Sequence, residues 1–113
     1  SFYMEYAPDN VINAIKVGDP VIESVQNSNF GKVKEIVTGD SIFWESGEDG
    51  HLVASPREGF SSLTLTMETE GVINRNGVAI DKSLYYVGLT TSLYVGNGSL
   101  KDGRISKITR VQE

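Results

Sequence analysis

The clearest alternation of hydrophobic and polar positions lies in residues 62–69, where Leu63, Leu65 and Met67 are each separated by one polar residue. Successive side chains of a β-strand point to opposite faces of the sheet. This spacing therefore predicts a strand with one face in a core and the other in water. No glycine or proline interrupts the stretch, so it is the most clearly defined element of the chain.

Similar short apolar stretches, separated by glycine, proline and asparagine, occur along the whole chain. They are residues 2–6, 21–25, 31–37, 41–44, 51–54, 72–73, 78–80, 84–87 and 92–95. In the first of them, Phe2, Met4 and Tyr6 are expected to share one face. Asn76-Gly77 is a strong hairpin signal between its two flanking stretches. About nine short strands with turn signals every eight to twelve residues are typical of a β-sandwich or barrel, so we predict an all-β domain.

One segment has a helical pattern instead. Pro8 supplies a stop before polar residues that can cap a helix. Val11, Ile12 and Ile15 then fall on one side of a helical turn or two. The sequence thus predicts at most one short helix, near residues 9–16.

Two stretches of the chain, residues 17–37 and 87–109, have the same order of features. Each opens with Val-Gly, passes through a short apolar strand and a polar loop, and closes with glycine, a basic residue and a β-branched residue. An isolated hairpin cannot bury its apolar face, whereas two hairpins can bury theirs against each other. The repeat therefore predicts a small, closed, pseudo-symmetric β-barrel.

The closing segments of the repeat share an unusual spacing. Val33 and Ile36 are three residues apart, as are Ile105 and Ile108, whereas a regular half-buried strand has a period of two. A β-bulge in each strand would account for this spacing. The alternative is a short helix over residues 32–37, which the β-branched content and short length disfavour. We predict strands in both segments, each interrupted by a bulge or a sharp coil at this point.

Composition narrows the possible functions. The 113 residues suit one domain, residues 1–113, and the absence of cysteine excludes disulfides and cysteine-based sites. Fifteen acidic and ten basic residues give a net charge of −5, which opposes binding to nucleic acid and to anionic lipid. No apolar run approaches the ~20 residues that cross a bilayer. The sequence of this chain therefore predicts no membrane-spanning segment within it.

Acidic side chains gather in the turn Glu45–Asp49, with Trp44 and His51 beside it. Paired carboxylates can serve as acid and base in a hydrolase, or bind calcium. The spacing does not match a calcium-binding loop, however, and acidic residues flanked by glycines are typical of an exposed hairpin tip. His51 is the only histidine, so a catalytic triad would depend on it alone. We expect no enzyme activity and no cofactor, and leave metal binding at this turn open.

Aromatic residues suggest a different kind of site. Trp44, Tyr85, Tyr86 and Tyr94 are candidates for contact with a sugar or a partner protein, because aromatic faces on a β-sheet stack on both. Neighbouring side chains of a strand point to opposite faces, so one of Tyr85 and Tyr86 is expected to be exposed. The alternative is that these rings close the ends of the barrel as core residues.

The turn and core residues resemble those of a bacterial family known as domain of unknown function 4330. The resemblance lies in Val17-Gly18-Asp19-Pro20-Val21, Gly31-Lys32-Val33-Lys34-Glu35-Ile36, Leu63-Thr64-Leu65-Thr66, Asn76-Gly77-Val78-Ala79-Ile80, Val87-Gly88 and Gly103-Arg104-Ile105. It spans nearly the whole chain but includes no reactive motif. It implies a single-pass membrane protein with a hydrophobic helix before Ser1 and this domain on the extracytoplasmic face of a bacterial cell membrane. The family brings no catalytic or binding residues.

Three functional hypotheses follow from these observations. The first is a non-enzymatic interaction or assembly domain of a membrane-anchored bacterial protein, which binds a protein partner or itself. The second is a carbohydrate- or peptide-binding module that uses exposed aromatic residues. The third is a hydrolase that uses the acidic turn.

Overall fold

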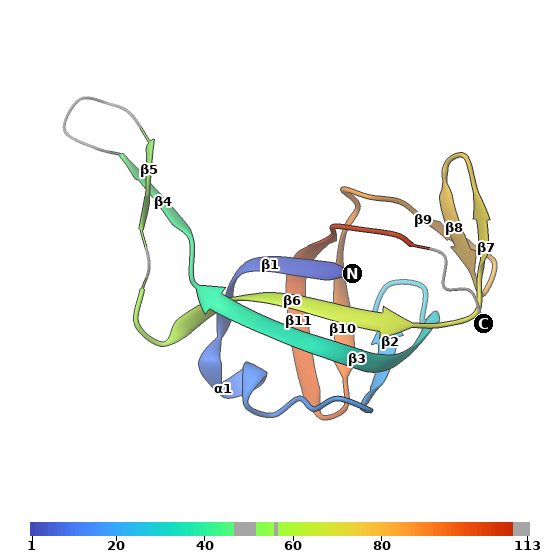
Figure 1. Cartoon of the computed structure of the whole chain (residues 1–113), viewed down its shortest axis with the longest axis horizontal. Coiled ribbons are helices and arrows are strands. Elements are labelled where there is room, and N and C mark those ends of the chain that lie inside the picture. Colours follow the sequence, from blue (N-terminus) through green and yellow to red (C-terminus); the bar gives the residue numbers. More distant parts are fainter. Residues whose placement is uncertain (47–51, 56, 110–113) are drawn as a thin grey trace.

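The computed structural model describes residues 1–46, 52–55 and 57–109, and for residues 44–46 and 52–55 it describes the backbone alone. Its elements are β1 (Phe2–Pro8), α1 (Asp9–Ile12), β2 (Pro20–Glu23), β3 (Asn29–Asp40), β4 (Phe43–Ser46), β5 (Leu52–Ser55), β6 (Phe60–Glu68), β7 (Val72–Asn74), β8 (Gly77–Ile80), β9 (Ser83–Tyr85), β10 (Thr90–Val95) and β11 (Gly98–Ile105). Figure 1 shows these elements along the chain. The prediction of an all-β domain with at most one short helix is confirmed.

Six strands form a closed antiparallel barrel in the order β1-β11-β10-β2-β3-β6. The predicted alternation in β6 is confirmed, because Leu63 and Leu65 are fully buried while Ser62 and Thr64 are only partly so. The core is apolar and includes Phe2, Val21, Val33, Leu63, Leu65, Leu93, Val95 and Leu100. Inward-facing residues of every barrel strand thus form one core.

The two similar stretches of sequence form equivalent hairpins, β2–β3 and β10–β11, which pair through β2 and β10. The N–H of Gly18 donates to the carbonyl of Val33 at 2.8 Å, and the N–H of Gly88 donates to the carbonyl of Ile105 at 2.7 Å. Both glycines have a left-handed backbone, with φ of 96° and 94°. The two hairpins are therefore preceded by matching hydrogen bonds.

The predicted irregularity is a register shift in β3, whereas in the second segment the strand ends at Ile105 and irregular backbone follows. A register shift also occurs in the pairing of β11 with β10, but it lies earlier in β11, between Leu100 and Gly103. In β3 the register shifts between Val33 and Glu35, so that Val33 and Ile36 both turn toward the interior despite their spacing of three. The helix considered for residues 32–37 is not formed, since β3 covers the segment. The second strand instead ends at Ile105, and Ile108 packs on the core from the irregular segment that follows.

The expectation that Tyr6 shares a face with Phe2 and Met4 is wrong. The pairing of β1 with β6 shifts register between Met4 and Ala7, which reverses the faces of the residues that follow. Ala7 is therefore fully buried, while Tyr6 is 48% exposed. The sequence pattern did not reveal this bulge, because alanine and tyrosine are compatible with either face.

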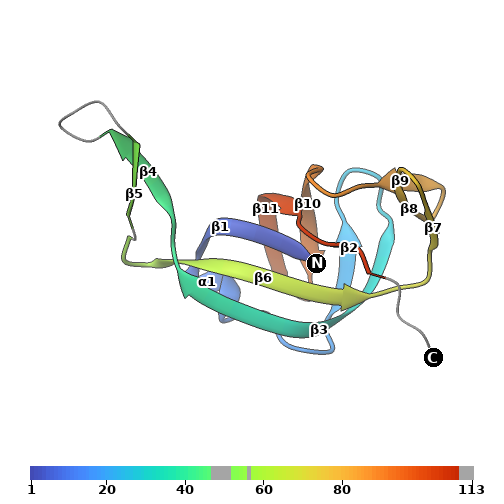
Figure 2. The same cartoon turned by 45° about the horizontal axis from the view of Figure 1, so that its top comes forward.

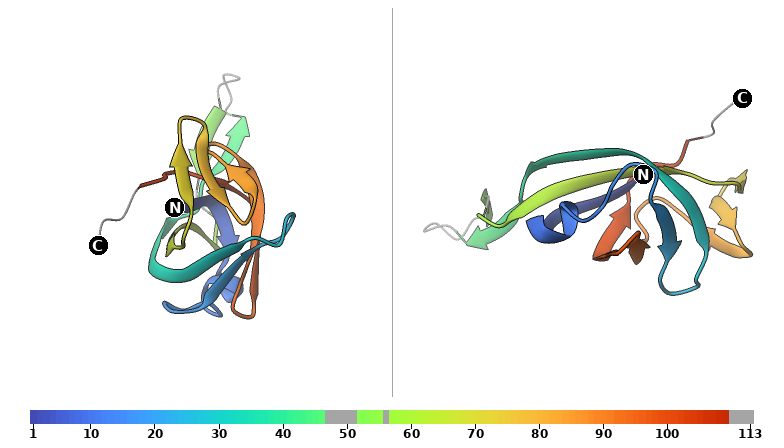
Figure 3. Two further views of the ribbon diagram at one scale, coloured as in Figure 1. Left: turned by 90° about the vertical axis from the view of Figure 1, so that its right-hand side faces the viewer. Right: turned by 90° about the horizontal axis from the view of Figure 1, so that it is seen from below.

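Two small sheets lie outside the barrel, at opposite ends of a molecule measuring 49 × 31 × 26 Å. The hairpin β4–β5 projects from one end, and the three-stranded sheet β7-β8-β9 lies at the other (Figures 1 and 2). The view from below in Figure 3 shows the same separation. We call β4–β5 the arm and β7-β8-β9 the cap. The cap confirms the hairpin predicted at Asn76-Gly77, with Asn74 paired to Gly77.

Candidate functional site

A cleft of about 870 Å³ lies between the cap and the adjacent end of the barrel. Its apolar lining includes Phe30, Met67, Val78, Ile80, Tyr85 and Ile105. The irregular segment 107–109 forms a further wall, and Glu68, Glu70 and Lys107 supply charged groups. The volume lies within the usual range of ligand-binding clefts, which are mostly apolar with a few polar groups.

The strand pairing of the cap brings one row of side chains to this cleft. Ile73 of β7 is paired with Val78 of β8, which in turn is paired with Tyr85 of β9. Directly paired residues project from the same face of a sheet, and all three line the cleft. Their exposure falls across the row, from 38% for Ile73 to 2% for Tyr85. The outer part of the row is therefore accessible, and the inner part is anchored in the core.

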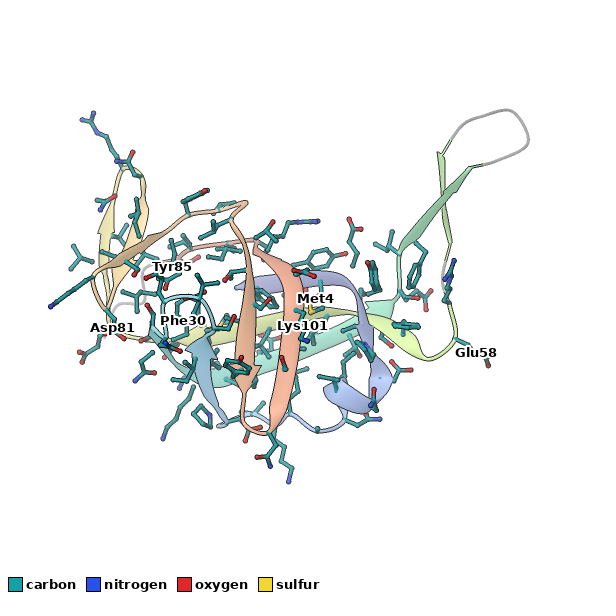
Figure 4. All side chains as sticks on the ribbon, turned by 180° about the vertical axis from the view of Figure 1, so that it is seen from behind. Met4, Phe30, Glu58, Asp81, Tyr85 and Lys101 are labelled. Atoms are coloured by element: carbon teal, nitrogen blue, oxygen red, sulfur yellow. The ribbon has the colours of Figure 1, made fainter. Side chains whose placement is uncertain are left out.

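Tyr85 is held rigidly at the inner end of the cleft. Its hydroxyl oxygen lies 3.0 Å from Oε2 of Glu23 and 2.6 Å from Oγ of Ser28. Its ring packs edge-on against Phe30, with 4.8 Å between the ring centroids. Figure 4 shows Phe30 and Tyr85 near each other at the barrel end close to Asp81, with Glu58 at the far end. Burial raises the pKa of the Tyr85 hydroxyl, and the Glu23 carboxylate adds to this rise, so the group is a neutral anchor.

Glu23 is an almost fully buried carboxylate, 1% exposed, behind Tyr85. It accepts hydrogen bonds from the N–H groups of Val25 and Gln26, both at 2.8 Å, and from the hydroxyl of Thr91 at 2.7 Å. Burial by itself raises the pKa of this carboxyl, but these hydrogen bonds and that of Tyr85 outweigh it and hold the pKa below its ordinary value. Glu23 therefore stays ionised and fixes the turn after β2.

Three of the four aromatic residues proposed as contacts have described side chains, and these differ in exposure. Tyr85 is buried, which agrees with the alternative hypothesis that it is a core residue. It also lines the cleft. Tyr86 is 47% exposed, so the expectation that one of the two neighbouring tyrosines is exposed is confirmed. Tyr94 is 51% exposed and lies opposite Ile22 on the barrel. Trp44 lies in the arm opposite Ala54, and its side chain is outside the described part of the structure.

The acidic turn falls largely outside the described residues. Glu48, Asp49 and His51 are not described, and Glu45 is described only as a backbone position in β4. Among the side chains that are described, no group of three histidine, aspartate or glutamate residues is arranged to hold a metal ion. The hypothesis of chemistry at this turn stays a prediction.

The base of the arm is fixed to the barrel by contacts that the sequence did not reveal. Phe43 stacks on Tyr6, with 4.4 Å between the ring centroids, and packs edge-on against Phe60 at 5.4 Å. The hydroxyl of Ser41, which is buried, accepts from the N–H of Arg57 at 2.7 Å and donates to its carbonyl at 3.1 Å. These contacts join the two ends of the hairpin to each other and to β1.

Sequence reasoning also missed the cleft. Phe30, Met67 and Ile105 come from three distant segments, which no local pattern connects. One signal was present in Val72-Ile73, because two consecutive apolar residues in a short strand place one apolar side chain on each face. Both residues are accessible, at 68% and 38%. A strand that is apolar on both faces yet exposed indicates a surface for contact.

Within the described residues, no helix is long and apolar enough to span a membrane. Comparison of the chain with known protein families, with curated proteins and with solved structures finds no match in any of the three.

Proposed function

We propose that this protein is a non-enzymatic interaction or assembly domain, and that the cleft between the barrel and the cap is its binding site. The observation that carries the proposal is the cleft itself, which is open, largely apolar and partly walled by exposed Val72 and Ile73. Covering such a surface removes apolar area from water, which favours binding of an apolar segment.

The polar groups of the site support binding rather than catalysis. Tyr85 and Glu23 have perturbed pKa values, but each perturbation follows from burial and from hydrogen bonds that the two groups and their neighbours already make. A general base needs a proton within reach, whereas the oxygens of Glu23 are occupied by four donors. The role of Tyr85 and Glu23 is to hold the inner wall of the cleft in one conformation. This lowers the entropy that is lost when a ligand binds.

On the basis of the resemblance described above, we propose that this interaction domain belongs to a membrane-anchored bacterial protein and lies on the extracytoplasmic face of the cell membrane. In that setting the barrel is a rigid support, and the cleft faces other proteins of the same compartment. The net charge of −5 is consistent with a protein partner and opposes nucleic acid.

Selection of peptides from a random library displayed on phage tests the proposed function. The immobilised domain is expected to enrich peptides with several apolar residues. Titration of these peptides into the labelled domain is expected to shift the amide resonances of Met67, Ile73 and Lys107 at the cleft. Enriched peptides are also expected to lose at least tenfold in affinity for Ile73→Glu, because a charge then lies on the apolar wall.

The matched control is Val17→Glu, which introduces the same charge at a residue that is 63% exposed and not part of the cleft lining. This variant is expected to bind as the unchanged protein does. If no peptide is enriched, or if the enriched peptides shift resonances around Tyr86 and Tyr94 instead, the cleft is not the binding site. In the second case, oligosaccharides would be the next ligands to titrate, because exposed aromatic rings would then carry the binding.

A further inference from the structure

We propose that the cleft is occupied by the arm of a second copy of this chain, so that molecules assemble head to tail. This inference rests on the proposed function, and it names the partner of the same site. Its donor is the hairpin β4–β5 at one end of the molecule, and its acceptor is the cleft beside the cap at the other end (Figures 1 and 3).

The arm is a sheet of two strands, β4 and β5. In the described part of the structure, β4 pairs with β5 and with no other strand. Its strands nevertheless carry Phe43, Trp44, Leu52, Val53 and Ala54. A two-stranded hairpin is at best marginally stable in water, and needs a further strand or a packed face to become independently stable. The composition of the arm therefore indicates that a partner covers it.

The base of the arm is fixed to the barrel. The stacking of Phe43 on Tyr6 and the pair of hydrogen bonds between Ser41 and Arg57 fix the point from which the hairpin leaves the barrel. Arg57 also lies over the ring of Phe43, with its guanidinium carbon 4.5 Å from the ring centroid. A projecting hairpin that is fixed in direction loses less entropy when it docks than a free loop would.

The end of the molecule that carries the cleft also has a strand edge with which an added strand can pair. In the part of the chain that the structure describes, β7 pairs only with β8, and no described strand pairs with its other edge. All three residues of β7 are exposed. The segment 107–109 forms the facing wall of the cleft and belongs to no strand. A hairpin inserted here can pair with the edge of β7 while its apolar side chains enter the cleft, which is the general mode of strand addition.

The geometry favours a second molecule over an internal contact. The arm and the cap lie at opposite ends of a molecule that is 49 Å long (Figure 2). The cleft lies beside the cap, so an arm anchored by Ser41 and Phe43 is far from its own cleft. Contact between two different surfaces of identical molecules is heterologous, and it produces a ring or an open chain rather than a two-fold dimer. Each molecule then donates one arm and accepts another.

Complementation between two variants tests the proposal. The first variant replaces residues 44–54 with a four-residue glycine-serine turn, which removes the arm but keeps Ser41, Phe43 and Arg57. The second is Ile73→Glu, which keeps the arm but places a charge in the cleft. By sedimentation velocity, each is expected to remain a monomer alone, and an equimolar mixture is expected to form a dimer of twice the mass. A mixture that stays monomeric, or an armless variant that assembles as the unchanged protein does, overturns the proposal.

Cross-linking keeps the proposal testable if the armless variant does not fold. The chain contains no cysteine, so single cysteines can be introduced without competing thiols. Molecules carrying Trp44→Cys, mixed with molecules carrying Val72→Cys, are expected to form a covalent dimer with a short bismaleimide linker. Val17→Cys in place of Val72→Cys is the control, and equal cross-linking to both overturns the proposed contact. A cleft that binds phage-selected peptides while the arm fails to cross-link would leave the proposed function intact.

Discussion

Replacing Gly31 with alanine is expected to lower the free energy of unfolding by about 3 kcal/mol or more, the largest loss among single glycine substitutions in the barrel. Gly31 has a φ of 81°, a conformation that other residues rarely adopt. A Cβ at this position would also overlap the backbone carbonyl of Glu68 in the neighbouring strand β6. A backbone cannot yield as a flexible side chain does, so β3 and β6 would have to separate. Urea unfolding followed by circular dichroism measures the loss.

The control for this prediction is Gly18→Ala. Gly18 has a similar φ of 96°, but a Cβ there would meet no atom within 4 Å. This variant is expected to lose only the conformational term, about 1–2 kcal/mol. Equal losses in the two variants would show that the close contact between β3 and β6 is not what requires glycine at position 31.

Replacing Glu23 with leucine is expected to destabilise the protein by about 3 kcal/mol or more, although leucine occupies the equivalent position, Leu93, in the second hairpin. The carboxylate of Glu23 accepts four hydrogen bonds, from two backbone N–H groups and from the hydroxyls of Tyr85 and Thr91. Leucine would remove the acceptor of the buried Thr91 hydroxyl and of the two partly buried N–H groups, whereas the Tyr85 hydroxyl would keep its contact with Ser28. Each donor that finds neither water nor another partner costs about 1–3 kcal/mol. Urea unfolding at neutral pH measures this loss, with the exposed Glu35→Leu as the control, expected within about 0.5 kcal/mol of the unchanged protein.

The pH dependence of stability, compared between the unchanged protein and Glu23→Leu, gives an independent check of the role of this carboxylate. The folded-state pKa of Glu23 is lower than its ordinary value, so its ionised form stabilises the fold. This contribution is fully present above the unfolded-state pKa and is lost as the pH falls through the folded-state pKa. The difference in stability between the unchanged protein and Glu23→Leu is therefore expected to narrow in acid. A constant difference from neutral to acid pH would contradict a role for the ionised carboxylate.

Much of the barrel could be predicted because its signals are local. The alternation of Leu63, Leu65 and Met67 predicted β6, and the repeated Val-Gly openings predicted two equivalent hairpins that close on each other. The bulge in β3 was also predictable, since the spacing of Val33 and Ile36 violates the period of a regular strand. The alternation in β6 and the bulge in β3 depend on residues that are near one another in sequence, and each hairpin of the repeat is itself a local unit.

The remaining features depend on contacts between distant segments. The cleft joins Phe30, Met67 and Ile105, and the base of the arm joins Tyr6 to Phe43 only because a bulge in β1 turns Tyr6 outward. Glu23 could not be recognised as buried, because a glutamate in a short strand is ordinarily exposed. These side chains come into contact only because the fold brings distant strands together, so a local sequence pattern does not reveal them.

The two ends of the molecule carry the proposed donor and acceptor, since one has a hairpin whose described strands pair only with each other and the other has an open apolar cleft. Light scattering behind a sizing column, applied to the unchanged protein over a range of concentrations, tests their complementarity most directly. The account predicts that the average mass rises with concentration above the 12.3 kDa of one chain, without stopping at a fixed dimer. A mass of 12.3 kDa at every concentration, up to the millimolar range, would contradict it.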